Sequence, residues 1–303
     1  MNVKSGFVSI IGKPNAGKST LLNALLGEKL SITTNKPQTT RKRVLGILSG
    51  DGYQVIFLDT PGILDPKYLL QKKMMDHVYQ SVGDSDIILF LTGIDDDPDV
   101  TKTLDDKTVK EVLSKTGFVK ILILNKIDLS NENVVNKLLD NKDLLSGFKS
   151  IIPVSAKENY NVDKLLATII ENLPEHPKYY PEDQLSDEPE RFFVSEIIRE
   201  KIFEIYKDEI PYSAEVLIEE FHEREGRKDF IQAAVIVERE SQKGIVVGKK
   251  GETIKKLGEQ SRNAIEAFLQ REVYLDLRVK VRPKWRSSEK FLRNFGYSKF
   301  EDE

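Results

Sequence analysis

The segment Gly-Lys-Pro-Asn-Ala-Gly-Lys-Ser at residues 12–19 constrains the fold of this chain more than any other feature. It follows the apolar run Gly6–Ile11 and precedes a helical pattern near 19–26, so the sequence predicts a strand, a glycine-rich loop and a helix in succession. In that context the loop N–H groups point at phosphate oxygens, Lys18 neutralises phosphate charge, and the Ser19 hydroxyl is a ligand for Mg²⁺. We therefore predict a phosphate-binding loop. The alternative is a glycine-rich turn that only caps the helix.

Short apolar runs alternate with helical patterns from residue 6 to residue 173. Continuous apolar runs are typical of parallel strands that are buried on both faces, and Asp51-Gly52 marks a hairpin. We expect strands at Gly6–Ile11, Arg43–Ser49, Tyr53–Leu58, Ile87–Leu91, Val119–Leu124 and Ser150–Val154, and helices near 19–26, 68–82, 100–116, 131–140 and 161–173. This order predicts a doubly wound α/β domain with a mostly parallel, six-stranded sheet.

A proline-rich segment follows at residues 174–190. Because proline cannot continue a helix or a central strand, we expect a semi-rigid linker there. The predicted organisation is a first domain at 1–173, this linker, and a second domain at 191–303 with a basic and aromatic tail.

The second domain has a different order of elements. We expect a helix over Phe192–Tyr206, strands over Ser213–Phe221 and Phe230–Arg239, a helix before a Gly-Lys-Lys-Gly turn at 248–251, a second helix from the turn to about Gln270, and a strand over Val273–Val281. The glycines of such a turn let a sugar–phosphate backbone approach closely, and its lysines neutralise phosphate charge. We predict RNA contacts from Gly248, Lys249, Lys250, Gly251 and Lys255. The alternative is a basic helix–helix turn that binds no RNA.

The charge of the chain is unevenly distributed. The formal net charge is −3, yet residues 241–300 carry 15 basic and 6 acidic side chains, followed by Glu-Asp-Glu at 301–303. A basic segment beside such a turn favours an RNA surface. The tail at 282–297 contains Trp285, Phe291, Phe295 and Tyr297. These rings either stack on RNA bases or pack on the domain, and the second interpretation is favoured.

Composition excludes several classes of site. The chain has no cysteine, which excludes disulfides, thiol nucleophiles and cysteine-ligated metals, and its three histidines lie far apart in the sequence. The longest strongly apolar run, Ile87–Leu91, is too short for a membrane helix. We expect a cytoplasmic protein, with peripheral attachment to a membrane left open.

Three further motifs follow the predicted strands of the first domain. Asp59-Thr60-Pro61-Gly62 places a carboxylate where it can hold Mg²⁺ and a glycine N–H where it can contact a γ-phosphate. The carboxylate of Asp128, in Asn125-Lys126-Ile127-Asp128, can accept from the two N–H groups of guanine, which adenine does not offer. Ser155-Ala156-Lys157 can meet the guanine carbonyl with backbone N–H groups.

Together with Gln-Thr-Thr-Arg-Lys at 38–42, these motifs resemble the five nucleotide-binding motifs of translation-factor-type GTPases. The Pro-Asn-x-Gly-Lys-Ser and Pro-Gln-Thr-Thr-Arg-Lys-Arg forms, followed by a type II KH order of elements, are similar to the Era family. The resemblance implies that GTP or GDP is bound by Gly12, Lys13, Pro14, Asn15, Ala16, Gly17, Lys18, Ser19, Thr20, Asp59, Thr60, Pro61, Gly62, Asn125, Lys126, Asp128, Ser155, Ala156 and Lys157. It implies Mg²⁺ ligation by Ser19, Thr40 and Asp59, and catalytic roles for Lys18, Thr40, Gly62 and Asn15.

The resemblance also implies a switch and a partner. Thr40 would close on Mg²⁺ in the GTP state and make 30–42 a mobile switch; the alternative is an ordinary polar loop. The implied partners are the 3′ end of 16S ribosomal RNA and the 30S subunit during assembly, coupled to cell growth. Peripheral association with the inner face of the cell membrane and a monomeric state are further expectations.

The residue that would orient the attacking water is missing from its usual place. Ras-like enzymes use a glutamine just after the Asp-x-x-Gly motif, whereas this chain has Ile63, and Gln71 is expected on a helix surface. One hypothesis is that Asn15 helps to hold K⁺ against the phosphates; the alternative is that Asn15 only stabilises the loop. A further one is that the ribosome supplies the missing group.

Two other functional classes remain as alternatives. A P-loop ATPase or small-molecule kinase is disfavoured by the Asn-Lys-Ile-Asp motif. A signalling GTPase that acts at the membrane is disfavoured because no lipidation motif or amphipathic anchor is evident.

Overall fold

The computed structural model describes residues 3–114, 117–141, 144 and 147–297. The chain forms two compact units, one of residues 1–67 and 71–187 and one of residues 68–70 and 188–303. Within the described residues, no helix is both long and apolar enough to cross a membrane. The domain limits at 173 and 190 remain predictions, and the acidic residues 301–303 lie outside the described part of the chain.

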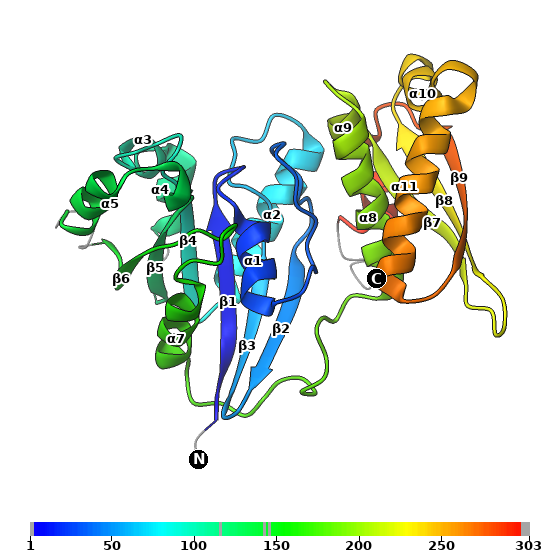
Figure 1. Ribbon diagram of the computed structural model, residues 1–303. Coiled ribbons are helices and arrows are strands. Elements are labelled where there is room, and N and C mark those ends of the chain that lie inside the picture. The colour runs from blue at the N-terminus through cyan, green and yellow to red at the C-terminus, as the bar shows by residue number, and fades with distance from the viewer. Residues whose placement is uncertain (1–2, 115–116, 142–143, 145–146, 298–303) are drawn as a thin grey trace. The chain divides into compact units, whose positions relative to one another are not determined.

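A six-stranded sheet forms the centre of the first unit, in the order β2-β3-β1-β4-β5-β6 (Figure 1). Its strands are β1 (Lys4–Gly12), β2 (Val44–Gly50), β3 (Tyr53–Asp59), β4 (Ile87–Gly93), β5 (Val119–Asn125) and β6 (Ser150–Pro153). The β2–β3 pair is antiparallel, and the other described pairs of this sheet are parallel. The predicted sheet is confirmed. Its parallel strands end at one edge, where open α/β sheets bind ligands.

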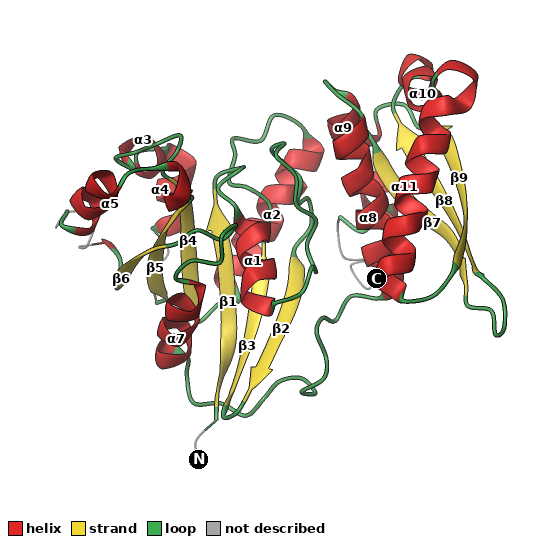
Figure 2. Ribbon diagram, in the orientation of Figure 1, coloured by secondary structure: helices red, strands yellow, loops and turns green. Residues whose placement is uncertain are grey.

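Helices cover both faces of this sheet (Figure 2). One core contains side chains of α1 (Lys18–Leu26) and α7 (Val162–Asn172), and the other contains side chains of α2 (Leu69–Gly83), α4 (Lys107–Leu113) and α5 (Glu132–Leu139). The remaining described helices of this unit are α3 (Thr101–Leu104) and the short turn η1 (Ile127–Leu129). Strands buried on both faces explain the continuous apolar runs of the sequence.

The single helix predicted at 100–116 is wrong, because α3 and α4 are separate. Asp106 lies between them in extended backbone, and its carboxylate accepts the N–H groups of Thr108 and Val109 at 2.9 and 3.2 Å. This is an N-cap, which starts a new helix rather than continuing the old one. Residues 115–116 lie outside the described part of the chain.

Residues 174–187, which we call the strap, pack on the sheet of the first unit. Gln54 of β3 is fully buried, and its side-chain oxygen accepts the N–H groups of Tyr179 and Tyr180 at 2.8 and 3.0 Å. The amide nitrogen of Gln54 donates to the Tyr180 carbonyl at 2.9 Å. Tyr180 packs on a small cluster of apolar side chains from β2 and β3. Most of the proline-rich segment is therefore bonded to this unit.

The second unit contains a three-stranded sheet in the order β7-β8-β9. Its strands are β7 (Glu215–His222), β8 (Asp229–Val237) and β9 (Val273–Val281), and its larger helices are α8 (Glu190–Ile205), α10 (Glu240–Val247) and α11 (Glu252–Leu269). Strands β7 and β8 pair antiparallel, whereas β8 and β9 pair parallel. Apolar side chains of α8 and α11 pack on one face of this sheet. The predicted order is confirmed, and the short helix α9 (Ile210–Ser213) is an addition.

The aromatic tail packs on its own unit. It forms the turn η3 (Trp285–Ser287) and the helix α12 (Glu289–Asn294). Trp285 is fully buried, and its indole N–H donates to the Ser213 carbonyl at 2.9 Å. The Phe295 ring meets Trp285 edge to face, with 5.6 Å between ring centroids. The packing interpretation of these two rings is confirmed, because such buried rings are not available for RNA bases.

Candidate nucleotide site and nucleic-acid surface

The glycine-rich loop lies between β1 and α1, as predicted. Gly17 has a φ of 97°, and a Cβ there would lie 2.3 Å from the side-chain nitrogen of Asn125. Only glycine fits this conformation and this close approach. The loop therefore presents its N–H groups ahead of the first turn of α1, where an anion is favoured.

Lys18 is buried beneath the loop. Its ammonium donates to the carbonyls of Gly12 and Lys13 at 3.2 and 3.0 Å. Burial lowers the pKa of Lys18 to about 8, and the nearby Asp59 carboxylate partly opposes this shift. An anion that approaches a buried ammonium stabilises its protonated form, which burial alone disfavours. Lys18 is therefore suited to bind phosphate.

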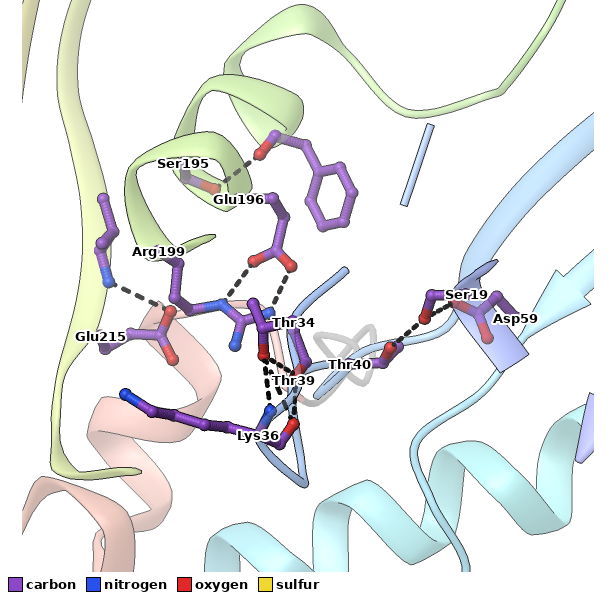
Figure 3. A network of polar contacts seen from close by, with 12 residues as sticks. Ser19, Thr34, Lys36, Thr39, Thr40, Asp59, Ser195, Glu196, Arg199 and Glu215 are labelled. Atoms are coloured by element: carbon purple, nitrogen blue, oxygen red, sulfur yellow. Dashed lines mark hydrogen bonds and ion pairs between the residues drawn. The ribbon is translucent and has the colours of Figure 1, made fainter. Parts of the chain in front are cut away.

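Three oxygen-bearing side chains meet beside the loop, as Figure 3 shows. The Ser19 hydroxyl donates to Oδ2 of Asp59 at 2.7 Å and lies 2.8 Å from the Thr40 hydroxyl. The other carboxylate oxygen of Asp59 is buried and has no hydrogen-bond partner among the described residues. Burial raises the pKa of Asp59, while the Ser19 hydrogen bond and the Lys18 charge oppose the rise. Hydroxyl and carboxylate oxygens are the ligands that Mg²⁺ prefers, so this cluster fits Mg²⁺.

The residues after Asp59 divide into two roles. The Thr60 hydroxyl is buried and donates to the Ile10 carbonyl at 2.8 Å, so it fixes the loop to β1. Gly62 lines the cavity described below. Ile63 is buried in the core, and its N–H donates to the Gly12 carbonyl at 3.0 Å. No side chain that can orient water stands at this position.

Gln71 does not replace the missing glutamine. It lies in α2, where its side-chain oxygen accepts the Lys67 N–H at 2.8 Å. The expectation that Gln71 is exposed on the helix surface is wrong, since the side chain is largely buried. The Gln71 side chain therefore stabilises the start of α2 and does not line the cavity.

At the other end of the site, Asn125 joins three segments. Its side-chain nitrogen donates to the Ala16 carbonyl at 2.8 Å, and its oxygen accepts the Ala156 N–H at 3.0 Å. The Ser155 hydroxyl donates to Asp128 at 2.6 Å, and Asp128 itself is exposed. Asn125 and Ser155 therefore hold the loops in place, and Asp128 presents its carboxylate to the solvent.

These segments enclose a cavity of about 570 Å³. Of the predicted nucleotide residues, those that line it are Pro14, Asn15, Gly17, Lys18, Ser19, Thr20, Thr40, Gly62, Asn125, Lys126, Asp128, Ala156 and Lys157. Those that do not line it are Gly12, Lys13, Ala16, Asp59, Thr60, Pro61 and Ser155. The ammonium of Lys13 instead pairs with Asp106 at 3.0 Å.

Sequence reasoning missed three residues that line the cavity, namely Asp95, Asp96 and Leu129. The two aspartates follow β4, whose end lies beside the end of β5. Position at the carboxyl end of a parallel strand is the signal that would have found them.

Asn15 and the segment 32–40 complete the wall of the cavity. Asn15 is exposed and has a φ of 64°, in the left-handed region. Thr34 and Thr39 are joined through their hydroxyls at 2.9 Å, and Thr39 also donates to the Lys36 carbonyl at 2.8 Å (Figure 3). The predicted switch thus forms a compact turn before Thr40.

In the second unit, the Gly-Lys-Lys-Gly turn lies between α10 and α11. Gly248 has a φ of 73°, and a Cβ there would lie 2.1 Å from the Thr253 hydroxyl. Lys249 and Lys250, at the tip, and Lys255, in the first turns of α11, are exposed. The structure therefore presents the predicted lysines to the solvent beside a turn that is closed by glycine.

Comparison with known proteins gives the same two-part division. The model of the 50S ribosome-binding GTPase family matches residues 7–126, and that of the KH domain matches residues 209–286. GTPase Era of Clostridium botulinum (strain Alaska E43 / Type E3) is 45% identical over 296 residues, covering 98% of this chain and 99% of that protein. GTPase Era of Geobacter sp. (strain M21) is 47% identical over 294 residues, covering 97% of this chain and 98% of that protein.

Two solved structures of Era are similar over the whole chain. One is an Aquifex aeolicus Era variant bound to GDP and AlF4⁻, with a TM-score of 0.91, 38% identity, and coverage of 98% of this chain and 100% of that chain. The other is Era in complex with MgGDPNP and nucleotides 1506–1542 of 16S ribosomal RNA, with a TM-score of 0.90, 38% identity and the same coverage.

Proposed function

This chain belongs to the Era family of GTPases, and from that premise we propose that it couples GTP hydrolysis to binding of 16S ribosomal RNA. It binds GTP with Mg²⁺, hydrolyses it to GDP and phosphate, and binds the 3′ region of 16S ribosomal RNA to assist assembly of the 30S subunit. The observation that carries the first half is the cavity with Lys18, Ser19 and Thr40 at one end and Asp128 at the other. The first end has the charge and hydroxyl groups that phosphates and Mg²⁺ require, and the second has the carboxylate that guanine requires.

The site residues supply binding and charge rather than covalent chemistry. Lys18 lies against the β- and γ-phosphates, and the loop N–H groups hold their oxygens. Ser19, Thr40 and Asp59 would hold Mg²⁺, which would supply positive charge to neutralise the charge that develops on the phosphate oxygens. The Gly62 N–H contacts the γ-phosphate, so loss of that phosphate frees both Gly62 and Thr40.

Water activation is the step for which the described residues after the Asp-x-x-Gly motif offer no dedicated side chain. Ile63 is buried, and Gln71 is bonded to the Lys67 N–H. We propose that Asn15 helps to hold K⁺ against the phosphates, where a cation acts as an arginine finger does. The support is that Asn15 lines the cavity in a fixed left-handed turn. The alternative source of the missing group is the ribosome.

RNA binding is assigned to the second unit. The turn at Gly248–Gly251 lets the RNA backbone approach, and Lys249, Lys250 and Lys255 neutralise its phosphates. The exposure of these three lysines supports the assignment. The salt dependence of binding should be steep, since lysine–phosphate contacts release counterions.

A cytoplasmic location is part of the proposal, and the proposed role in ribosome assembly supports it. Peripheral association with the inner face of the cell membrane and a monomeric state are part of the proposal, and they rest on the family resemblance. Cell fractionation tests the location: we expect the protein in the soluble fraction, with any membrane-bound portion released by high salt.

The nucleotide assignment is tested by Asp128→Asn. Because an amide donates where the carboxylate accepts, this variant should lose GTP binding and gain xanthosine triphosphate binding. A variant that binds GTP as the wild type does would contradict the guanine assignment and favour a P-loop ATPase or kinase.

The RNA assignment is tested by the double variant Lys249→Asp and Lys250→Asp. It should lose binding to a 3′-terminal 16S RNA fragment and keep intrinsic GTP hydrolysis. The matched control changes Lys137 and Lys164, two exposed lysines of the first unit, to Asp. RNA binding that survives in the first variant, or falls equally in the control, would remove the KH turn from the proposal.

A further inference from the structure

Lys126, a predicted nucleotide residue, has an ion-pair partner outside the motifs. Its ammonium lies 2.8 Å from a carboxylate oxygen of Asp95, and their side chains are 25% and 22% exposed. The backbone fixes this pair, because Gly93 lies beside Asn125 in the β4–β5 register and the Ile94 N–H donates to the Asn125 carbonyl at 3.2 Å. Two neighbouring parallel strands thus place the two charges together.

The space around the pair also limits the path of the lysine side chain. A Cβ on Gly93 would lie 2.6 Å from Oδ1 of Asp95 and 3.4 Å from Cδ and Cε of Lys126. The pair therefore lies directly over Gly93, where no side chain interferes. Asp95 and Lys126 both line the nucleotide cavity, as do Asp128 and Leu129. The methylene stem of Lys126 consequently follows the cavity wall toward Asp95.

A lysine stem is apolar and packs on flat surfaces, but it has many rotamers to lose when it does so. An ion pair that holds the ammonium removes much of this freedom before a ligand arrives, which favours binding. We propose that Asp95 is a positioning residue for guanine nucleotides: it holds Lys126 extended, so that the stem forms a wall for the base. This inference rests on the proposed function, because it needs a guanine nucleotide in the cavity.

The test is binding of fluorescently labelled GDP and GTP to Asp95→Asn. We expect the dissociation constants of both nucleotides to rise equally, by about threefold to tenfold, mainly through faster dissociation. The rise is equal because the base is common to both. The matched control is Asp105→Asn, which removes another 2.8 Å lysine pair, with Lys110, whose side chains are 76% and 61% exposed. That control should bind as the wild type does.

A positioning role is separated from a structural one by a double-mutant cycle. Lys126→Met keeps the stem and removes the charge, so Asp95→Asn should have no further effect in that background. Asp95→Glu should recover part of the affinity. Unchanged affinity in Asp95→Asn, a loss confined to GTP, or an undiminished loss in the Lys126→Met background would each overturn the proposal. If Asp128→Asn also left GTP binding unchanged, the proposed function itself would fail, so the two failures are distinguishable.

A second, independent observation concerns the end of the strap. The Ile47 N–H donates to the Leu185 carbonyl at 2.8 Å, and the Ser186 hydroxyl donates to the Leu45 carbonyl at 2.5 Å. Both partners lie on β2, which begins at Val44, opposite Asp59 in the β2–β3 register. The predicted switch at 30–42 leads directly into this strand. The switch, the Mg²⁺ ligand Asp59 and the strap therefore meet at one end of β2.

The strap also continues directly into α8 of the second unit. We infer that it is a relay: a shift of β2, caused by ordering or release of residues 30–42, changes the bonds at Leu185 and Ser186 and so the path of the chain toward α8. This inference rests on the proposed GTP-dependent switch. It gives the protein a route between nucleotide state and RNA affinity that runs through these hydrogen bonds and then along the main chain.

The relay is tested on the full chain with Ser186→Ala. We measure the ratio of RNA dissociation constants with a GTP analogue and with GDP, and expect the wild-type ratio to move toward one in the variant. The matched control, Ser114→Ala, removes a serine-to-carbonyl bond of 2.7 Å at the C-terminal end of α4, outside the strap. A wild-type ratio that persists in Ser186→Ala would overturn the relay. A wild-type ratio of one would instead contradict the proposed switch.

Discussion

The hydroxyl of Ser19 donates a 2.7 Å hydrogen bond to Oδ2 of Asp59. A serine hydroxyl has one proton, so the Thr40 hydroxyl, 2.8 Å away, donates to Ser19 in turn. The first turn of α1, the end of β3 and the predicted switch are thereby held together by three side chains. In the proposed Mg²⁺ site, bonds to the metal would replace these hydrogen bonds among side chains that are already close together, which would lower the cost of ordering them.

Removing the Ser19 hydroxyl should uncouple nucleotide binding from Mg²⁺. For the wild type, GDP affinity should be much higher with Mg²⁺ than with EDTA, and for Ser19→Ala we expect this ratio to fall about tenfold or more. The measurement is the GDP dissociation constant in both conditions. The control is Thr60→Val, because the Thr60 hydroxyl donates to the Ile10 carbonyl and does not line the cavity. It should lower stability by about 1–2 kcal/mol and keep the ratio. A ratio unchanged in Ser19→Ala would contradict the metal assignment.

The lowered pKa of Lys18 predicts a pH dependence of stability. Burial holds this pKa at about 8 in the folded protein, against 10.5 for the unfolded chain. Between these values the unfolded chain binds more protons, so stability of the nucleotide-free protein should rise as pH increases from about 8 to 10. Lys18→Met should remove that rise and should also stabilise the free protein at pH 7. Thermal unfolding at several pH values measures both effects.

The same group predicts the pH dependence of binding. Because phosphate favours the protonated ammonium, nucleotide affinity should fall as pH rises through about 8. Lys13→Met is the matched control, since Lys13 pairs with Asp106 and does not line the cavity. A fall of the same size in Lys18→Met would show that another group titrates.

The sequence predicted most of the residues that line the cavity, because loops after parallel strands meet at one edge of the sheet. Gly17, Lys18 and Ser19 lie where their spacing places them. What the sequence could not show is which polar side chains are free to meet a ligand and which already bond other parts of the protein. Thr60 and Asn125 have side chains suited to a ligand, but they bond the protein itself. Only the packed loops reveal which polar group is already satisfied.

Residues outside motifs were missed for a related reason. Asp95 belongs to a run of three aspartates that resembles a solvated loop in the sequence, and its pairing with Lys126 depends on the strand register. The prolines of 174–190 predicted a break in regular structure, and the structure has no helix or long strand over 174–189. They do not reveal that Gln54, more than a hundred residues earlier, bonds that segment.

Gln54 should therefore control the stability of the strap. Gln54→Leu keeps the size of the side chain and leaves two N–H groups, of Tyr179 and Tyr180, without their acceptor. We expect the free energy of unfolding of the first unit to fall by about 2–4 kcal/mol and trypsin to cleave faster after Lys178. Urea unfolding and limited proteolysis measure these effects. Gln80→Leu, at an exposed position of α2, is the control. Equal cleavage rates in the two variants would show that Gln54 does not hold the strap.

The identity of the monovalent cation tests what replaces the missing glutamine. If Asn15 helps to hold K⁺, hydrolysis should be about tenfold or more faster in KCl than in NaCl at the same ionic strength. Asn15→Ala should reduce this ratio to near one while GDP affinity changes little, because the loop N–H groups and Lys18 still hold the phosphates. Single-turnover hydrolysis in both salts is the measurement. Equal rates for the wild type would remove K⁺ from the mechanism. The ribosome would then be the remaining source, and 30S subunits should accelerate hydrolysis in either salt.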